Sequence, residues 1–118
     1  MIVKSVKTRS YDFALKIINT YCKLPKAQQD FLLSKQLLKS GTSIGARLQM
    51  VSDKDPKKDL FVQLNLSKKE TLETSYLLRL MNDIGYLPEG EFANLFAECN
   101  ELSTTLQSMI GKLKKFPF

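Results

Sequence analysis

Apolar residues recur at spacings of three and four along most of the chain, and no stretch alternates apolar and polar residues over a useful length. The first pattern is typical of amphipathic helices, and the second would indicate half-buried strands. Proline and glycine interrupt the helical pattern at Pro25, Pro56, Gly85 to Pro88 and Pro117. Because these residues punctuate secondary structure, the sequence predicts four helices, at residues 10–24, 26–51, 56–84 and 88–115.

Residues suited to helix ends support these limits. Ser10 is an acceptable N-cap, and Pro25 can occupy the first turn of the second helix. Asp55 and Pro56 are typical of a helix start, whereas Gly85 suits the left-handed position that follows a helix. Short connections between long helices make neighbours antiparallel. We therefore predict an all-α fold, an up-down antiparallel four-helix bundle that forms one domain over residues 1–118.

Small residues gather in the middle of two of the predicted helices. The second helix carries a seam with heptad-like spacing that contains Gly41 and, one turn later, Gly45. We expect these two stretches to meet, so that the helices approach more closely than the usual distance. The residues concerned are Gly41, Gly45, Ser67, Thr71 and Thr74. The competing interpretation is a helix break near Ser40 that exposes Thr42 and Ser43; continuity is favoured because the seam keeps its phase.

Charge is divided unevenly along the chain. Residues 1–69 carry fourteen basic and five acidic side chains, whereas residues 70–111 carry one basic and seven acidic ones. Lys112, Lys114 and Lys115 follow, and the formal net charge is +6. Segregation of this kind is typical of a side that faces nucleic acid. It also suits head-to-tail contacts between copies, or ordinary solvated helix faces.

Residues that commonly carry chemistry are scarce. The chain has no histidine, and its two cysteines, Cys22 and Cys99, lie far apart. This excludes Cys/His zinc sites and predicts two reduced thiols. Glu70 and Glu73 share a helix face, but a di-iron bundle would also need Glu-x-x-His partners. The sequence holds no P-loop, serine elbow or dinucleotide-binding motif. We expect no catalytic site, no metal and no cofactor.

Hydropathy argues against a membrane protein. The longest stretch without a charge, Leu102 to Gly111, has ten residues, about half of what a membrane-spanning helix needs. The first seven residues lack the apolar region of a secretory signal. The expectation is a cytoplasmic protein that makes no membrane contact.

Several motifs resemble one known family. Ser-Lys-Gln-Leu-Leu-Lys-Ser-Gly-Thr-Ser-Ile-Gly-Ala occupies residues 34–46. Lys-Lys-Asp follows at 57–59, Lys-Glu-Thr-Leu-Glu-Thr-Ser-Tyr-Leu-Leu at 69–78 and Gly-Tyr-Leu at 85–87. The chain resembles the bacterial four-helix bundle proteins of the 23S rRNA intervening-sequence type, the so-called S23 ribosomal proteins. The resemblance covers nearly the whole chain, from Tyr11 to the final helix.

The resemblance carries implications for assembly and partners. It implies a cyclic homopentamer. A related branch is the accessory variability determinant of diversity-generating retroelements, a basic protein that binds nucleic acid and a reverse transcriptase. One stretch departs from the family pattern, because Asn and acidic residues usually follow Ser-Ile-Gly-Ala. This chain instead has Arg47 to Val51, which replaces an acidic patch by a basic and apolar one.

Apolar rows that look doubled give a separate reason to expect a closed oligomer. In the last helix Leu95 stands beside Phe96, and Met109 stands beside Ile110. The third helix has similar doubling at residues 60–62 and 76–78. Rows of this width exceed one core-facing stripe and suggest burial on a second side.

Two hypotheses about function come from these observations. The first is a non-enzymatic, oligomeric protein that binds structured RNA or DNA through phosphate contacts. Its candidate contacts are Lys35, Lys39, Arg47, Lys54, Lys57, Lys58, Lys68 and Lys69. The alternative is a scaffold that binds a protein partner, such as a reverse transcriptase, without touching nucleic acid.

Overall fold

Helices form nearly all of the computed structural model, which describes residues 2–51 and 54–115, with side chains from Ser5 onward. Within those ranges there is no strand, which confirms the all-α prediction. The helices are α1 (Ile2–Cys22), α2 (Lys26–Gln29), α3 (Leu32–Leu48), α4 (Pro56–Asp83) and α5 (Glu91–Lys115).

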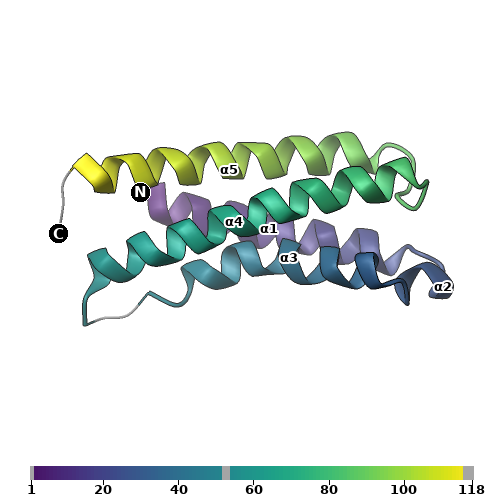
Figure 1. Ribbon diagram of the computed structural model, residues 1–118, viewed down its shortest axis with the longest axis horizontal. Helices are drawn as coiled ribbons and strands as arrows, with labels where there is room; N and C mark the ends of the chain where they lie inside the picture. Colours follow the sequence, from purple (N-terminus) through teal and green to yellow (C-terminus); the bar gives the residue numbers. More distant parts are fainter. Residues whose placement is uncertain (1, 52–53, 116–118) are drawn as a thin grey trace.

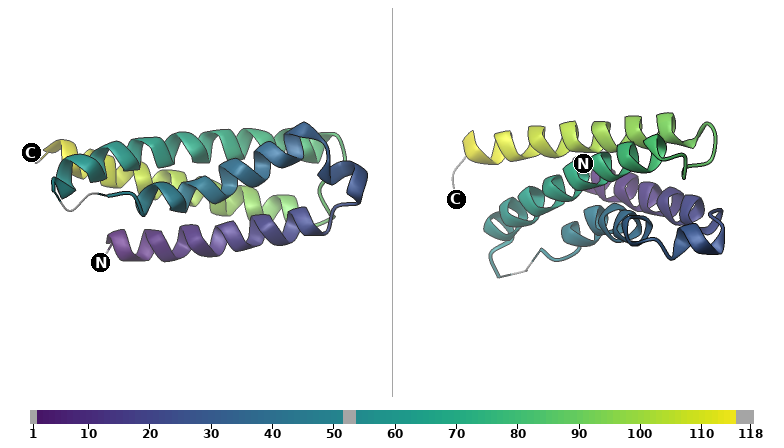
Figure 2. Two further views of the ribbon diagram at one scale, coloured as in Figure 1. Left: turned by 90° about the horizontal axis from the view of Figure 1, so that it is seen from below. Right: turned by 45° about the vertical axis from the view of Figure 1, so that its right-hand side comes forward.

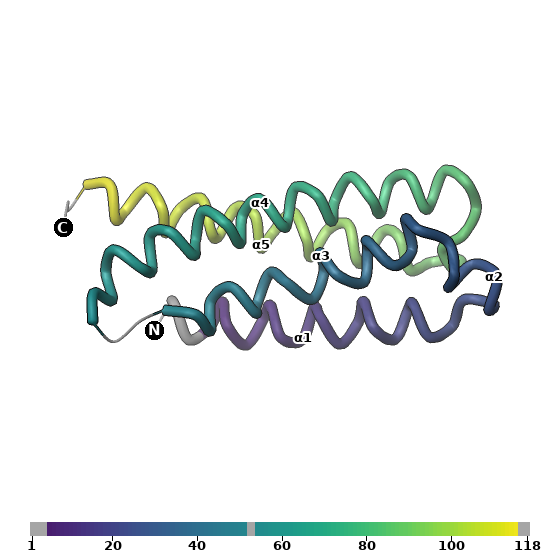
Figure 3. The backbone as a smooth tube through the Cα atoms, turned by 60° about the horizontal axis from the view of Figure 1, so that its bottom comes forward, coloured from purple at the N-terminus to yellow at the C-terminus, as the bar shows by residue number. Residues whose placement is uncertain are grey.

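The four long helices form an antiparallel bundle, as predicted (Figure 1). α1 packs on α3 and α5, and α4 packs on the same two helices, so α1 and α4 stand at diagonal corners. The bundle measures 47 × 23 × 20 Å. α1 and α4 begin, and α3 and α5 end, toward one end of it, whereas α2 and the α4–α5 turn lie at the other (Figures 1 and 3).

α1 begins at Ile2, eight residues before the expected start at Ser10. Ser10 is not a cap: it is fully buried inside the helix, and its hydroxyl donates to the Lys7 carbonyl at 3.0 Å. No proline or glycine precedes Ser10, and Val6 is buried in the core. Core packing of this extra segment therefore extends the helix beyond its predicted limit.

The helix predicted over residues 26–51 begins at Lys26 as expected, but it is broken between α2 and α3 and ends at Leu48, three residues early. Phe31 has an extended backbone (φ −66°, ψ 133°) that separates the two helices, visible as a bend in Figure 2. Its ring packs edge-on against Tyr86 at 5.3 Å. The Tyr21 hydroxyl also donates to the Gln29 carbonyl at 2.9 Å, which ties α2 to α1. Phe31 and Tyr86 are far apart in the sequence, so local periodicity does not reveal the contact between them.

The remaining helix ends follow the sequence more closely. Asp55 caps α4 by accepting from the Lys58 amide at 3.4 Å, and Pro56 is its first residue. Gly85 follows α4 with φ +76°, which confirms the predicted left-handed residue. α5 begins at Glu91 rather than at 88, after a second left-handed glycine, Gly90.

One hydrophobic core runs the length of the bundle. Its largest fully buried members include Phe13 and Ile17 of α1, Ile44 of α3, Leu64 of α4 and Leu106 of α5. Three of the four residues in the doubled rows of the last helix, Leu95, Met109 and Ile110, are buried in this same core. The fourth, Phe96, is half-buried and stacks on Phe92 with the ring centroids 5.1 Å apart. α4 differs, because Val62 and Tyr76 are exposed.

The close packing predicted for the small residues occurs, but between different partners. A Cβ on Gly41 would lie 2.8 Å from Cγ1 of Ile17, and one on Gly45 would lie 2.9 Å from Oγ of Ser10. Both glycines thus pack against α1, and the expectation that they face α4 is wrong. The side of α3 that meets Ser67, Thr71 and Thr74 instead carries Ser40 and Ile44. Each of these two residues directly precedes one of the glycines. α3 runs unbroken through Ser40 to Ser43, which removes the alternative of an exposed loop.

Buried hydrogen bonds join the two helices along the α3–α4 seam. Ser67 donates to the Ile44 carbonyl at 2.7 Å. The Thr74 hydroxyl lies 2.9 Å from Ser40 Oγ and 2.7 Å from the Glu70 carbonyl oxygen. Because these side chains are buried, their polar groups need such partners. The seam therefore fixes the register of α3 against α4.

Candidate nucleic-acid interface

One end of the bundle is strongly basic. The α4 helix begins and the α5 helix ends there, because the two are antiparallel neighbours (Figure 1). We call the following exposed residues the basic end: Lys54, Lys57, Lys58, Lys112, Lys114 and Lys115. The opposite end carries the carboxylates of Asp83, Glu89 and Glu91. At that end Asp30 and these three carboxylates outnumber Lys23 and Lys26, so the two ends of the bundle differ in net charge.

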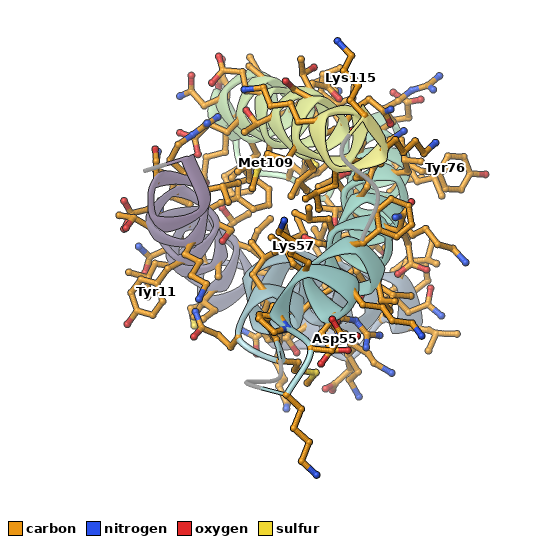
Figure 4. The ribbon with its side chains drawn as sticks, turned by 90° about the vertical axis from the view of Figure 1, so that its left-hand side faces the viewer. Tyr11, Asp55, Lys57, Tyr76, Met109 and Lys115 are labelled. Carbon is orange, nitrogen blue, oxygen red and sulfur yellow. The ribbon has the colours of Figure 1, made fainter. Side chains whose placement is uncertain are left out.

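The basic end unites three of the eight candidate phosphate contacts with three lysines of the last helix. Figure 4 views the bundle from this end and labels Lys57 and Lys115 on their two helices. The α5 lysines were not among the candidates. The signal that could have identified them was already in the sequence, because an antiparallel hairpin of helices 56–84 and 88–115 brings their outer ends together.

The other five candidates are dispersed. Lys35 and Lys39 lie exposed on α3, away from the basic end, and Lys69 is exposed on the outer side of α4. Two of the five have partners within the bundle. Arg47 Nε lies 3.9 Å from Glu70 Oε2, and the Lys68 amine donates to the Gln107 side chain. The structure therefore does not bring these five together with the basic end as one surface.

The seam between α1 and α5 is an open groove lined largely by polar side chains. Residues seven apart on each helix meet as rungs of an antiparallel ladder. Lys23 pairs with Glu91 at 3.4 Å, and Lys16 pairs with Glu98. At the third rung, Arg9 Nη1 donates to Thr105 Oγ1 at 3.1 Å, so a hydroxyl replaces the carboxylate.

Two exposed apolar stripes lie on the diagonal corners of the bundle. The α1 stripe is Tyr11, Leu15 and Ile18; the α4 stripe is Val62, Leu72 and Tyr76. Figure 4 shows Tyr11 and Tyr76 pointing outward on opposite sides. Each stripe lies away from the core-facing side of its helix, so neither can be covered within one chain.

The two cysteines of the described chain differ in burial. Burial raises the pKa of the Cys99 thiol from its ordinary 9.0 to about 12, against a smaller opposite effect of a hydrogen bond from the Ser75 backbone. A thiol with a raised pKa is a poor nucleophile. Cys22 is exposed. Over the same residues, no three His, Cys, Asp or Glu side chains are grouped so that they could hold a metal ion. None of the helices described is long and apolar enough to cross a membrane.

Fold and charge together define a small four-helix bundle protein whose charge is separated along its axis. The model of the 23S rRNA-intervening sequence protein family matches residues 4–108. The chain belongs to this family, as its motifs suggested.

A solved structure agrees with this assignment. It is the crystal structure of a protein with unknown function from the S23 ribosomal protein family of Bacteroides thetaiotaomicron. The two chains are 34% identical, and their structures superpose with a TM-score of 0.84. The similarity covers 94% of this chain and 99% of the other. No curated protein matches the chain.

Proposed function

We propose that this protein is a non-enzymatic, oligomeric nucleic-acid-binding protein of the cytoplasm that uses its basic end to contact phosphates, most suitably those of structured RNA. The observation that carries the proposal is the gathering of six lysines at one end of the bundle, where they outnumber the two described acidic residues beside them, Asp55 and Asp59. Phosphate contacts of this kind supply affinity without choosing a sequence.

Five of the six lysines of the basic end differ in their contacts from three lysines elsewhere in the bundle. Lys16, Lys23 and Lys26 each pair with a carboxylate. By contrast, Lys57, Lys58, Lys112, Lys114 and Lys115 make no ion pair or hydrogen bond through their amines to other described residues. An excess of cations over carboxylates at one end creates a local positive field that attracts a polyanion.

A salt titration of binding tests the proposal. Fluorescence anisotropy with several unrelated labelled RNA and DNA oligonucleotides should show binding that weakens steeply with salt and depends little on sequence. Release of counterions from six phosphates implies a slope of roughly −5 in log K against log salt for a duplex. Absence of binding even at low salt would contradict the proposal, and would favour the alternative of a scaffold for a protein such as a reverse transcriptase.

Charge-removal variants locate the contact. Lys57→Gln, Lys58→Gln and Lys114→Gln together remove three charges from the basic end. Lys35→Gln, Lys39→Gln and Lys69→Gln remove three exposed charges elsewhere, with the same change in net charge. We expect the first set to reduce the salt slope by about 3 and the second to change it little. Equal effects of the two sets would show that binding is not confined to the basic end.

Self-association is the second part of the proposal. The two apolar stripes lie at diagonal corners, so copies that pack the α1 stripe of one against the α4 stripe of the next meet through two different surfaces. Such a heterologous contact closes into a ring when the rotation between neighbours permits. A homopentamer, as the family resemblance implies, is one such ring. Light scattering should give a mass several times the 13.5 kDa of one chain.

A further inference from the structure

The groove between α1 and α5 changes character along its length. Toward the acidic end of the bundle, Glu91 and Glu98 line a part of about 470 Å³ together with Lys16 and Lys23. At the basic end a second part has a volume of about 350 Å³, and no Asp or Glu is among the described residues that line it. This part, which we call the Arg9 groove, is lined by Ser5, Arg9, Thr104, Thr105, Ser108, Met109 and Lys112.

The ladder between the two helices explains why this part lacks a carboxylate. In each of the first two rungs a lysine of α1 pairs with a glutamate of α5, so that the two opposite charges offset each other. Rung three has Thr105 at the equivalent position, which holds the Arg9 guanidinium through one hydrogen bond at 3.1 Å. No described carboxylate oxygen lies within 4.0 Å of the Arg9 nitrogens, although Asp12 and Glu101 line the neighbouring stretch of groove with it. The hydrogen bond to Thr105 thus orients the Arg9 guanidinium, and no described carboxylate pairs with its positive charge.

The Arg9 groove retains several donors for a ligand. Arg9 uses one of its five N–H groups on Thr105. The hydroxyls of Ser5 and Ser108 and the amine of Lys112 have no partner among the described residues. Thr104 and Thr105 use their protons on helix carbonyls, at 3.0 Å each, and can still accept. One guanidinium, one ammonium and two free hydroxyls form a donor set that matches the oxygens of a phosphate group.

We propose that the Arg9 groove binds a phosphate group through Arg9, Lys112, Ser5 and Ser108. Under the function proposed above, on which this choice of source rests, the ligand is a backbone phosphate of the nucleic acid. The groove opens beside the lysines of the basic end, so a strand that follows those lysines can seat one phosphate in it. The guanidinium then fixes the position of that phosphate, while the surrounding lysines act as less directional charges.

Three substitutions remove the site by different routes. Arg9→Gln and Lys112→Gln each delete a cationic donor. Thr105→Glu supplies the missing carboxylate of the third rung, which should pair with Arg9 and repel phosphate. Lys16→Gln is the matched control, because it makes the same change in net charge one rung away on the same helix. Thermal unfolding followed by circular dichroism checks that all four variants fold.

Two probes report on the site. Labelled RNA followed by anisotropy should bind about tenfold more weakly to each of the three groove variants, because a charge-assisted hydrogen bond is lost. Its affinity for Lys16→Gln should stay close to that of the parent. Inorganic phosphate, followed by amide NMR shifts, should perturb residues 5–9 and 104–112 of the parent and leave them unperturbed in Thr105→Glu.

The outcomes separate the two proposals. If RNA binds the parent and all three groove variants behave like Lys16→Gln, the Arg9 groove is overturned as a site while the proposed function stands. If RNA does not bind but phosphate shifts the groove amides, the site is supported with free phosphate as its ligand, and nucleic acid is overturned as the source. If neither probe binds, both proposals are overturned.

Discussion

Two glycines and the side chains opposite them determine how closely α3 approaches α1. Gly41 faces Ile17, whose β-branched side chain is stiff at χ1 and cannot turn aside easily. Gly45 faces Ser10, which is buried and holds the Lys7 carbonyl. Helix propensity disfavours both glycines, so their presence is explained by space rather than by backbone conformation. Neither has a positive φ.

Alanine substitution should therefore act in opposite directions at two helical glycines. At Gly41 the new methyl group would overlap Ile17 Cγ1, at 2.8 Å, and crowd its Cβ, at 3.3 Å. The cost of overpacking exceeds the propensity gain, and we expect Gly41→Ala to lose roughly 1 kcal/mol of unfolding free energy. At Gly111 nothing lies within 4 Å, and Gly111→Ala should gain up to about 1 kcal/mol. Urea unfolding of both at equal protein concentration measures this; shifts in the same direction would contradict the packing argument.

Cys99 makes the free energy of unfolding fall as the pH rises above about 9. Burial keeps its thiol protonated to about pH 12 in the folded chain, whereas the unfolded thiol loses its proton above its ordinary pKa of 9.0. The unfolded state is then favoured as the pH rises from 9 toward 12, and stability falls by about 1.4 kcal/mol per unit. Between about pH 8 and about pH 10, the stability advantage of the parent over Cys99→Ala should narrow by about 1.4 kcal/mol. Cys22→Ala, at the exposed cysteine, is the control; an equal narrowing there would show that Cys99 is not the cause.

At the scale of elements, buried hydroxyls set the pairing of α3 with α4. Ser40 and Thr74 lie opposite each other at 2.9 Å, and Ser67 reaches across to the Ile44 carbonyl. A slide of one helix past the other would leave these polar groups without partners in the core, which costs more than the loss of an apolar contact. Buried hydrogen bonds therefore specify the register of α3 against α4, in addition to side-chain packing.

A double-mutant cycle measures the Ser40–Thr74 contribution. Thr74→Val keeps the volume but leaves Ser40 Oγ without its donor, and Ser40→Ala removes the acceptor. We expect each single variant to lose about 1 kcal/mol, with a coupling energy of roughly 0.5–1 kcal/mol in the pair. The exposed contact of Ser75 with Asn100, at 3.4 Å, is the reference and should show almost no coupling. A coupling near zero at Ser40–Thr74 would mean that packing alone sets the register.

Periodicity predicted the long helices but not all of their limits. The seam that includes Leu64, Thr71 and Leu78 and the stripe that includes Leu95 and Leu106 gave α4 and α5 almost correctly, because one face of each is buried along its length. The break at Phe31 depends on Tyr86, which is distant in sequence, and no local signal reveals it. Ser10 has the residue type of a cap but lies opposite a glycine in the core. The partner of Gly41 could not be assigned because two adjacent faces of α3 both carry small residues.

The candidate site was predictable only in part, for a related reason. Lys57 and Lys58 sit in the first turn of a well-marked helix, so their grouping with Lys54 followed from the sequence. Their union with the lysines of α5 needs the antiparallel pairing of the last two helices. To predict the Arg9 groove, one must also know the register of α1 against α5. This register pairs Arg9 with Thr105, which is 96 positions away in the chain.

At the scale of the whole molecule, the diagonal position of the two stripes makes a specific prediction about assembly. Leu15→Glu damages the α1 stripe, and Leu72→Glu damages the α4 stripe. In a heterologous assembly each variant alone should be a monomer, since every contact would contain one damaged stripe. Mixed in equal amounts, the two should form dimers and nothing larger, because only one intact contact is available.

Light scattering of the separate and mixed variants gives the answer. Gln36→Glu, which adds one negative charge at an exposed residue of α3 outside both stripes, is the control for added charge. If Leu15→Glu alone abolished assembly while Leu72→Glu kept it intact, the contact would join two α1 stripes, and the proposed α1-to-α4 ring would be wrong.

The separation of charge along the long axis gives each protomer an electric dipole, and this has a consequence for the proposed ring. Neighbours that lie parallel place like ends side by side, so their dipoles repel, and the apolar stripes must overcome that repulsion. Salt shortens the range of repulsion, to about 10 Å at 0.1 M, while it weakens phosphate binding. Raising the ionic strength should therefore tighten the ring and loosen its hold on RNA, two opposite responses that share one origin in the arrangement of charge.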